Sequence, residues 1–209
     1  MNRKFFIAIF AFCAIAAAFA FAHGAFAQER KAAERYKIGD KGPGGGIVFY
    51  YSEEGFPVQD SDDVPPVICH YLECARKEMK NVPWCPCGGC DIKTEDEIGE
   101  GKLNTARIIN YTHGEPLTSS NCAAYACAAY STKTTNAGEW YLPNGYELRL
   151  LYQNLRKGKK KIASNATHWS SEQWDISCNN AHWLNFKTGM SCSCYRKYFA
   201  LAARAIRAF

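Results

Sequence analysis

Strand-type patterns at both ends of the chain enclose a helical middle, and this order constrains the fold more than any other feature. After a glycine turn at 42–46, residues 47–51 combine β-branched and aromatic side chains, which predicts a strand. At the other end, segments 168–174, 181–189 and 201–209 are apolar or aromatic-rich and are separated by polar turns. Strands at both ends with helices between them predict one domain of the α+β class. We expect its first and last strands to lie near each other, because the termini of short domains commonly do.

The clearest helix pattern spans residues 142–157. Its apolar stripe has the spacing i, i+3, i+4 and i+7 and consists of Leu148, Leu151, Tyr152 and Leu155. Asn144, followed three residues later by Glu147, resembles a capping box with Asn in the Ser/Thr position. Segments 101–111 and 119–131 predict two more helices. Residues 52–68 are expected to form a loop, and 68–75 are compatible with a strand or a short helix.

The first 27 residues have the pattern of a cleaved export signal. Arg3 and Lys4 precede the apolar stretch 5–21, and a small-x-small motif ends at Ala27. A membrane anchor is the alternative, but the sequence becomes polar and charged from Gln28 onward. No later segment approaches the roughly 20 apolar residues of a membrane span. We therefore expect a single domain at 28–209, which is secreted, periplasmic or on the outer surface.

Ten cysteines follow the signal segment, and in an oxidising compartment such a number favours disulfides. The tight group Cys85, Cys87 and Cys90 could instead hold zinc or an iron–sulfur centre, although it lacks a second pair at zinc-finger spacing. The pairing cannot be read from the sequence. Cys13 is compatible with lipidation, but the apolar stretch continues well past it.

The chain shows no recognisable catalytic signature. It contains neither G-x-S-x-G nor H-E-x-x-H. Loss of Arg3 and Lys4 with the signal lowers the net charge from +5 to +3, which is too mild to indicate nucleic-acid binding. The acidic residues at 60–63 lack EF-hand spacing. We expect no catalysis, no cofactor and no metal.

Several stretches, taken in order, resemble a family of bacterial exported domains. They are KIGDKGPGGGIVFYY at 37–51, YLECA at 71–75, IGEGKLNTARII at 98–109, EWYLPNGYELRLLYQNL at 139–155, HWSSEQW at 168–174 and RAIRAF at 204–209. Together they resemble the family named after the C-terminal domain of the Lcl adhesin. The resemblance spans nearly the whole exported part and implies a C-type-lectin-like fold, akin to the formylglycine-generating enzymes, with a role in adhesion or recognition.

The chain departs from that family in two respects. Its cysteine content is higher, with thiols where small or aromatic residues are expected. The E-P-N or Q-P-D and W-N-D motifs of calcium-dependent lectins are missing, since Glu115-Pro116 is followed by Leu117. The resemblance therefore implies no calcium-dependent sugar site.

The segment 174–203 has the composition of a recognition surface. Some proteins with this fold are the variable targets of diversity-generating retroelements, which replace adenines and turn Asn codons into codons for Ser, Cys, Tyr, Arg, His, Asp and Phe. Within it, residues 175–186 and 191–199 are largely drawn from that set, and recognition surfaces favour aromatic residues and Arg. The predicted ligand-binding residues are Trp174, Asp175, Ser177, Cys178, Asn180, His182, Trp183, Ser191, Cys192, Ser193, Cys194, Tyr195, Arg196, Tyr198 and Phe199.

Three hypotheses remain open. The leading one is a non-catalytic protein that presents this face to an unknown protein or glycan. The second is an oxidase related to the formylglycine-generating enzymes that works through Cys192 and Cys194. The third is a structural envelope protein. For the predicted face itself, the alternative to recognition is a polar hairpin held by Cys192 or Cys194.

Overall fold

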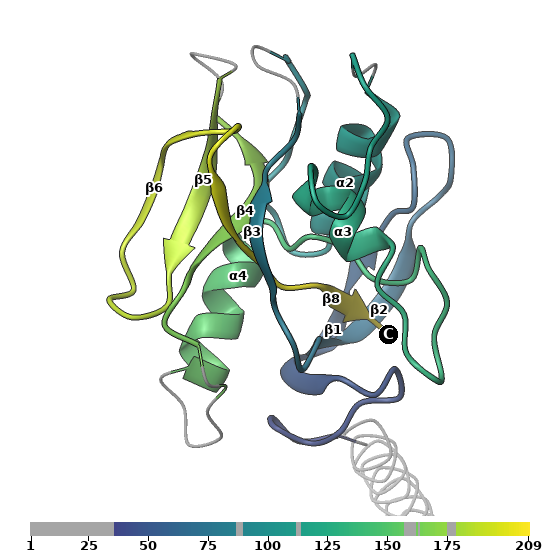
Figure 1. The fold of residues 1–209 in the computed structure, drawn as a ribbon. Helices are drawn as coiled ribbons and strands as arrows, with labels where there is room; N and C mark the ends of the chain where they lie inside the picture. The colour runs from purple at the N-terminus through teal and green to yellow at the C-terminus, as the bar shows by residue number, and fades with distance from the viewer. Residues whose placement is uncertain (1–35, 87–89, 112–113, 157–161, 163, 175–178) are drawn as a thin grey trace, which may run out of the picture. The chain divides into compact units, whose positions relative to one another are not determined.

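Strands from the two ends of the chain share one antiparallel sheet in the computed structural model, which describes residues 36–86, 90–111, 114–156, 162, 164–174 and 179–209. Residues 38–209 form one unit. Its three-stranded sheet has the order β1 (Ile47–Val58), β2 (Val67–Cys74) and β8 (Ile206–Ala208). The first and last strands flank β2, which confirms that they lie near each other (Figure 1). The expected export signal lies outside the described residues.

A second sheet holds most of the C-terminal part. Its strands, in spatial order, are β3 (Met79–Pro83), β7 (Ala200–Ala203), β4 (Thr167–Gln173), β5 (Asn180–Asn185) and β6 (Ser191–Arg196). The β4–β7 pair is parallel and the other pairs are antiparallel. Strand β6 therefore lies at one edge of the sheet, as Figure 1 shows.

The three predicted helices are present. They are α2 (Gly101–Asn110), α3 (Ala123–Ala128) and α4 (Gly145–Leu151), which continues into a π-helical turn at Tyr152–Arg156. Asn144 and Glu147 form the predicted capping box, in which each side chain accepts the backbone N–H of the other. The α+β class is confirmed. No helix within the described ranges is both long and apolar enough to cross a membrane.

Two boundaries differ from the sequence prediction. The loop expected at 52–68 is shorter, because β1 continues to Val58 and β2 begins at Val67. Segment 201–209 is not one strand but two, since β7 and β8 belong to different sheets. Between them, Arg204 is buried and donates to Ala75 O at 2.8 Å and to Glu78 Oε2 at 2.9 Å, which holds the chain where it crosses between the sheets.

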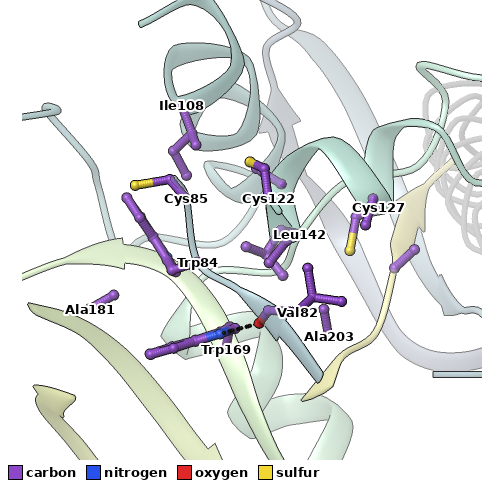
Figure 2. Close-up of a cluster of buried hydrophobic side chains, with 14 of the residues drawn as sticks. Val82, Trp84, Cys85, Ile108, Cys122, Cys127, Leu142, Trp169, Ala181 and Ala203 are labelled. Carbon is purple, nitrogen blue, oxygen red and sulfur yellow. Dashed lines mark hydrogen bonds between the residues drawn. The ribbon is translucent and has the colours of Figure 1, made fainter. Parts of the chain in front are cut away.

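One hydrophobic core lies between helices α2 and α3 and the five-stranded sheet (Figure 2). Trp84 and Trp169 are fully buried in it, and each indole N–H donates to a backbone carbonyl, Ser170 O at 2.8 Å and Val82 O at 2.9 Å. A buried indole without such an acceptor would cost free energy. These two bonds therefore fix both rings and tie β3 to β4.

A second core joins the three-stranded sheet to α4. Its members include Phe49, Leu72, Leu148 and Leu155, so the predicted apolar stripe of α4 is buried as expected. Beside this core, the Glu73 carboxylate accepts the N–H groups of Gly44 at 2.8 Å and Gly46 at 2.9 Å. A Cβ on Gly46 would lie 2.6 Å from Cys74 O, so the close approach of the turn requires glycine there.

Four described cysteines are thiols, which the sequence could not tell apart from the disulfide partners. Cys69 is half-buried, and Cys74, Cys122 and Cys127 are buried. Cysteine in such a position acts as a small hydrophobic residue. Burial raises the pKa of the Cys74 thiol to about 12. Between two cysteines of the described ranges, the structure contains the disulfide Cys192–Cys194. The positions Cys13, Cys87 and Cys178 lie outside the described residues.

Candidate recognition surface

Three aromatic side chains gather at the end of β6 and in the turn that follows it. Tyr195, Tyr198 and Phe199 are 36%, 57% and 44% exposed. The Phe199 ring lies 5.0 Å from that of Tyr195 and 4.7 Å from that of Tyr198, measured between centroids. The Tyr195 ring also lies 5.8 Å from Trp169. We call Tyr195, Tyr198 and Phe199 the aromatic cluster; it extends from the buried Trp169 to the solvent.

Lys197 anchors the turn from inside. It is fully buried, and its ammonium donates to Cys90 O at 2.8 Å and to Gln173 Oε1, and lies 4.5 Å from the Trp84 ring centroid. The backbone N–H of Lys197 donates to Asn179 O at 2.9 Å, and the Lys197 carbonyl accepts the backbone N–H of Trp84 at 2.8 Å. Lysine is almost never buried without partners. These bonds hold the turn against the core while its neighbours Tyr198 and Phe199 project outward.

Sequence reasoning did not include Lys197 in the predicted surface. A single lysine between Arg196 and Tyr198 carries no pattern that marks it as buried. Only the three-dimensional structure reveals that this lysine is buried. A polar residue in the turn between two strands either faces water or needs buried hydrogen-bond acceptors. Here the backbone carbonyl of Cys90 and the Gln173 side chain supply those acceptors.

His182 does not belong to the predicted face. It is 8% exposed, and its Nδ1 lies 3.4 Å from Glu172 Oε2. Burial, with a smaller contribution from Arg149, lowers the pKa of His182 to about 4, so the ring is neutral at neutral pH. Side chains alternate along β5, and this alternation places His182 on the side of the sheet that α4 covers. The two are so close that a Cβ on Gly145, the first residue of α4, would meet the His182 ring.

The remaining predicted residues divide by position. Trp183 is half-buried and packs against the first core. Asn180 is half-buried, and its carbonyl accepts Trp174 N–H at 3.0 Å; the Trp174 side chain is 43% exposed. The edge strand β6 supplies Ser191, Cys192, Ser193, Cys194 and Arg196, all exposed or half-buried. The structure therefore brings the β6 residues, Tyr198 and Phe199 together, whereas Asp175, Ser177 and Cys178 lie outside the described residues.

Away from this surface, several polar side chains of the described residues gather around the Glu78 carboxylate. Glu78 Oε2 accepts from Ser164 Oγ at 2.7 Å, His168 Nε2 at 3.0 Å and Arg204 Nη2 at 2.9 Å. The hydrogen bond from His168 is the main cause that lowers the pKa of Glu78 to about 2. Ser164 and His168 both point at this carboxylate. A serine nucleophile needs a base that accepts its proton, and the lowered pKa of Glu78 makes this carboxylate a weak base.

Of the cysteine group at 85–90, Cys85 and Cys90 lie within the described residues and Cys87 does not. Cys85 Sγ and Cys90 Sγ lie 3.4 Å apart, and Lys197 Nζ lies 3.3 Å from Cys90 Sγ. Among the described residues, no group of three or more His, Cys, Asp and Glu side chains is arranged to hold a metal ion. A nearby ammonium also disfavours a second cation by charge repulsion.

Comparison with known proteins adds no relative. No protein-family model matches the chain, and no curated protein sequence matches it either. The resemblance to the Lcl C-terminal domain therefore stays a prediction from the motifs.

Proposed function

We propose that this chain is an exported recognition protein whose ligand, a protein or a glycan, binds at the aromatic cluster and the neighbouring edge strand β6. The single observation that carries the proposal is the combination of exposure and anchoring. Tyr195, Tyr198 and Phe199 present large apolar area to water, while Lys197 between them is bonded to the core. A rigid aromatic surface loses little conformational entropy on binding, which is why recognition sites favour it.

The scaffold we infer is a C-type-lectin-like domain of the Lcl type. Support comes from the α+β architecture and from the strands at both chain ends in one sheet, together with the order of the motifs. Arg196, exposed beside the aromatic cluster, adds a charged hydrogen-bond donor of the kind enriched at binding hot spots. Export is inferred from the signal-type N-terminus and display on a bacterial surface from the resemblance to the Lcl family, and both belong to the same proposal.

The test is a binding screen of the 28–209 protein against a peptide-display library and a glycan array. A double variant, Tyr198→Ser with Phe199→Ser, removes two rings of the cluster. The matched control is Val67→Ser with Ile68→Ser, which removes two apolar side chains that are 65% and 58% exposed on β2. We expect ligands selected by the unmodified protein to bind the control and to bind the cluster variant at least tenfold more weakly.

Two outcomes would count against recognition at this surface. One is a screen that enriches no ligand; the other is a ligand that binds the cluster variant as well as the control. Programmed variation is a separate question with a separate test. A near-copy of codons 174–203 beside a reverse-transcriptase gene, differing only at adenines, would support it.

A further inference from the structure

Strand β6 carries one residue more than the strand with which it pairs. Trp183 lies opposite Cys192 and Ala181 lies opposite Tyr195, so two steps along β5 correspond to three steps along β6. Ser193 and Cys194 therefore share the place opposite the single residue between Ala181 and Trp183. This arrangement is a β-bulge, and it lies in a strand at the edge of the sheet.

The Cys192–Cys194 disulfide spans this bulge. Its two Cα atoms are 5.4 Å apart, whereas two residues of extended strand cover about 6.6 Å. Strand β6 is thus shortened at the place where the extra residue is accommodated, and the disulfide spans that place. Both the register and the Cα separation locate the constraint in the same three residues.

The bulge decides on which face of the sheet Tyr195 lies. In the observed register Tyr195 is opposite Ala181, and its ring lies 5.8 Å from Trp169. If β6 had no bulge and the Trp183–Cys192 pair were kept, Cys194 would lie opposite Ala181 and Tyr195 would lie opposite Asn180. Because side chains alternate along a strand, this shift by one residue turns Tyr195 to the other face of the sheet.

We propose that the Cys192–Cys194 disulfide is a redox-sensitive lock on the register of β6. A dithiol reductant supplies two electrons and two protons; the S–S bond breaks, two thiols form, and the dithiol becomes a disulfide. Cys194 is exposed and Cys192 half-buried, so the bond is within reach of such a reagent. Reduction releases the bulge, and Tyr195 leaves Trp169 and Phe199. This change of register requires no ligand; its effect on binding rests on the proposed function.

The test is NMR of the 28–209 protein with and without a dithiol. In the oxidised protein we expect NOEs between Ala181 and Tyr195 across the strands and between the rings of Tyr195 and Trp169. In the reduced protein these should disappear, and NOEs between Ala181 and Cys194 should replace them. The double variant Cys192→Ser with Cys194→Ser should give the NOE pattern of the reduced protein without any reductant. Adding the dithiol to this variant is the control for effects of the other cysteines.

A third variant separates the register from mere loss of the bond. Deleting Ser193 in the Cys192→Ser, Cys194→Ser background removes the extra residue, so Tyr195 returns to its place opposite Ala181 without a disulfide. Its NOE to Trp169 should reappear. The proposal is overturned if the reduced protein keeps the Ala181–Tyr195 contact, or if the deletion fails to restore it. If the register shifts but a selected ligand still binds, the lock stands and the proposed binding surface fails.

Discussion

Replacing Glu172 by Gln should change the pH dependence of stability in a direction that the structure fixes. Glu172 is largely buried, and its Oε1 accepts the N–H of Gly145, the first residue of α4, at 2.6 Å. Burial is the largest cause that raises the pKa of this carboxyl, from 4.5 to about 7, against the opposing effect of the Gly145 hydrogen bond. Asp96 raises the pKa further and Arg149 lowers it.

The sign follows from linkage. In the unfolded chain the carboxyl titrates near 4.5 and in the folded protein near 7, so between these values the folded state holds one more proton. The stabilisation is therefore fully present below pH 4.5 and is lost as the pH rises through 7. Each pKa unit corresponds to about 1.4 kcal/mol, which makes the loss about 3 kcal/mol. Gln cannot ionise and lacks this loss.

The assay is urea unfolding of both proteins at pH values from 4.5 to 8, with stability extrapolated to water. The free energy of unfolding of the Gln variant minus that of the unmodified protein should increase by about 3 kcal/mol across this range. Taking the difference removes the contribution of groups that do not contact Glu172, including Glu147, whose pKa burial also raises to about 7.

Asp62→Asn is the matched control. The hydrogen bond from Arg107 lowers the pKa of Asp62, so this carboxylate is ionised in the folded and unfolded states over the whole pH range. The free energy of unfolding of the Asn variant minus that of the unmodified protein should therefore not change with pH. A flat difference for Glu172→Gln would refute the reasoning, because it would mean that the folded protein does not shift the pKa of this group. A difference that decreases with pH would show that the assigned direction is wrong.

Three more predictions concern the scaffold. Gly46→Ala should lower the free energy of unfolding by about 1–3 kcal/mol, since its Cβ would overlap Cys74 O and the Trp140 ring; Gly114→Ala, with nothing within 4 Å, should cost far less in the same urea titration. Asn144→Ala should cost about 1–2 kcal/mol through loss of the helix cap, measured by thermal unfolding. The Cys74 thiol should resist alkylation in the native protein and react in urea, and a mass spectrum showing it in a disulfide would contradict the structure.

Local chemistry explains which elements the sequence could predict. The capping box and apolar stripe of α4 depend on residues within one or two turns of each other, so both were found at their positions. The polar stretch Ser52-Glu53-Glu54-Gly55 has loop composition, yet it lies within β1, at an irregularity between the Tyr51–Tyr71 and Phe56–Cys69 pairs that β1 forms with β2. Pairing between segments that are distant in the sequence cannot be predicted from the residue types within four positions.

The candidate site was predictable only in part, for the same reason. Exposed aromatic residues and Arg196 were identified by composition, and the structure places Tyr195, Tyr198 and Phe199 together. The burial of His182 depends on α4 lying against β5, which a count of side-chain types cannot reveal. Given the predicted export, the cysteine count favoured disulfides but did not indicate which sulfur atoms meet, because disulfide formation depends on Cα separation and not on number.

The structure limits how far segment 174–203 could vary if it were diversified. Lys197 holds the turn through Cys90 O and Gln173, and Ala181 and Leu184 are buried in the two cores. Lysine codons are rich in adenine, so adenine replacement at position 197 would remove the buried ammonium and leave its acceptors without a donor, at a cost of about 1–3 kcal/mol. Variation compatible with folding is therefore confined to side chains that face water, and the aromatic cluster owes its fixed geometry to a residue that must itself stay constant.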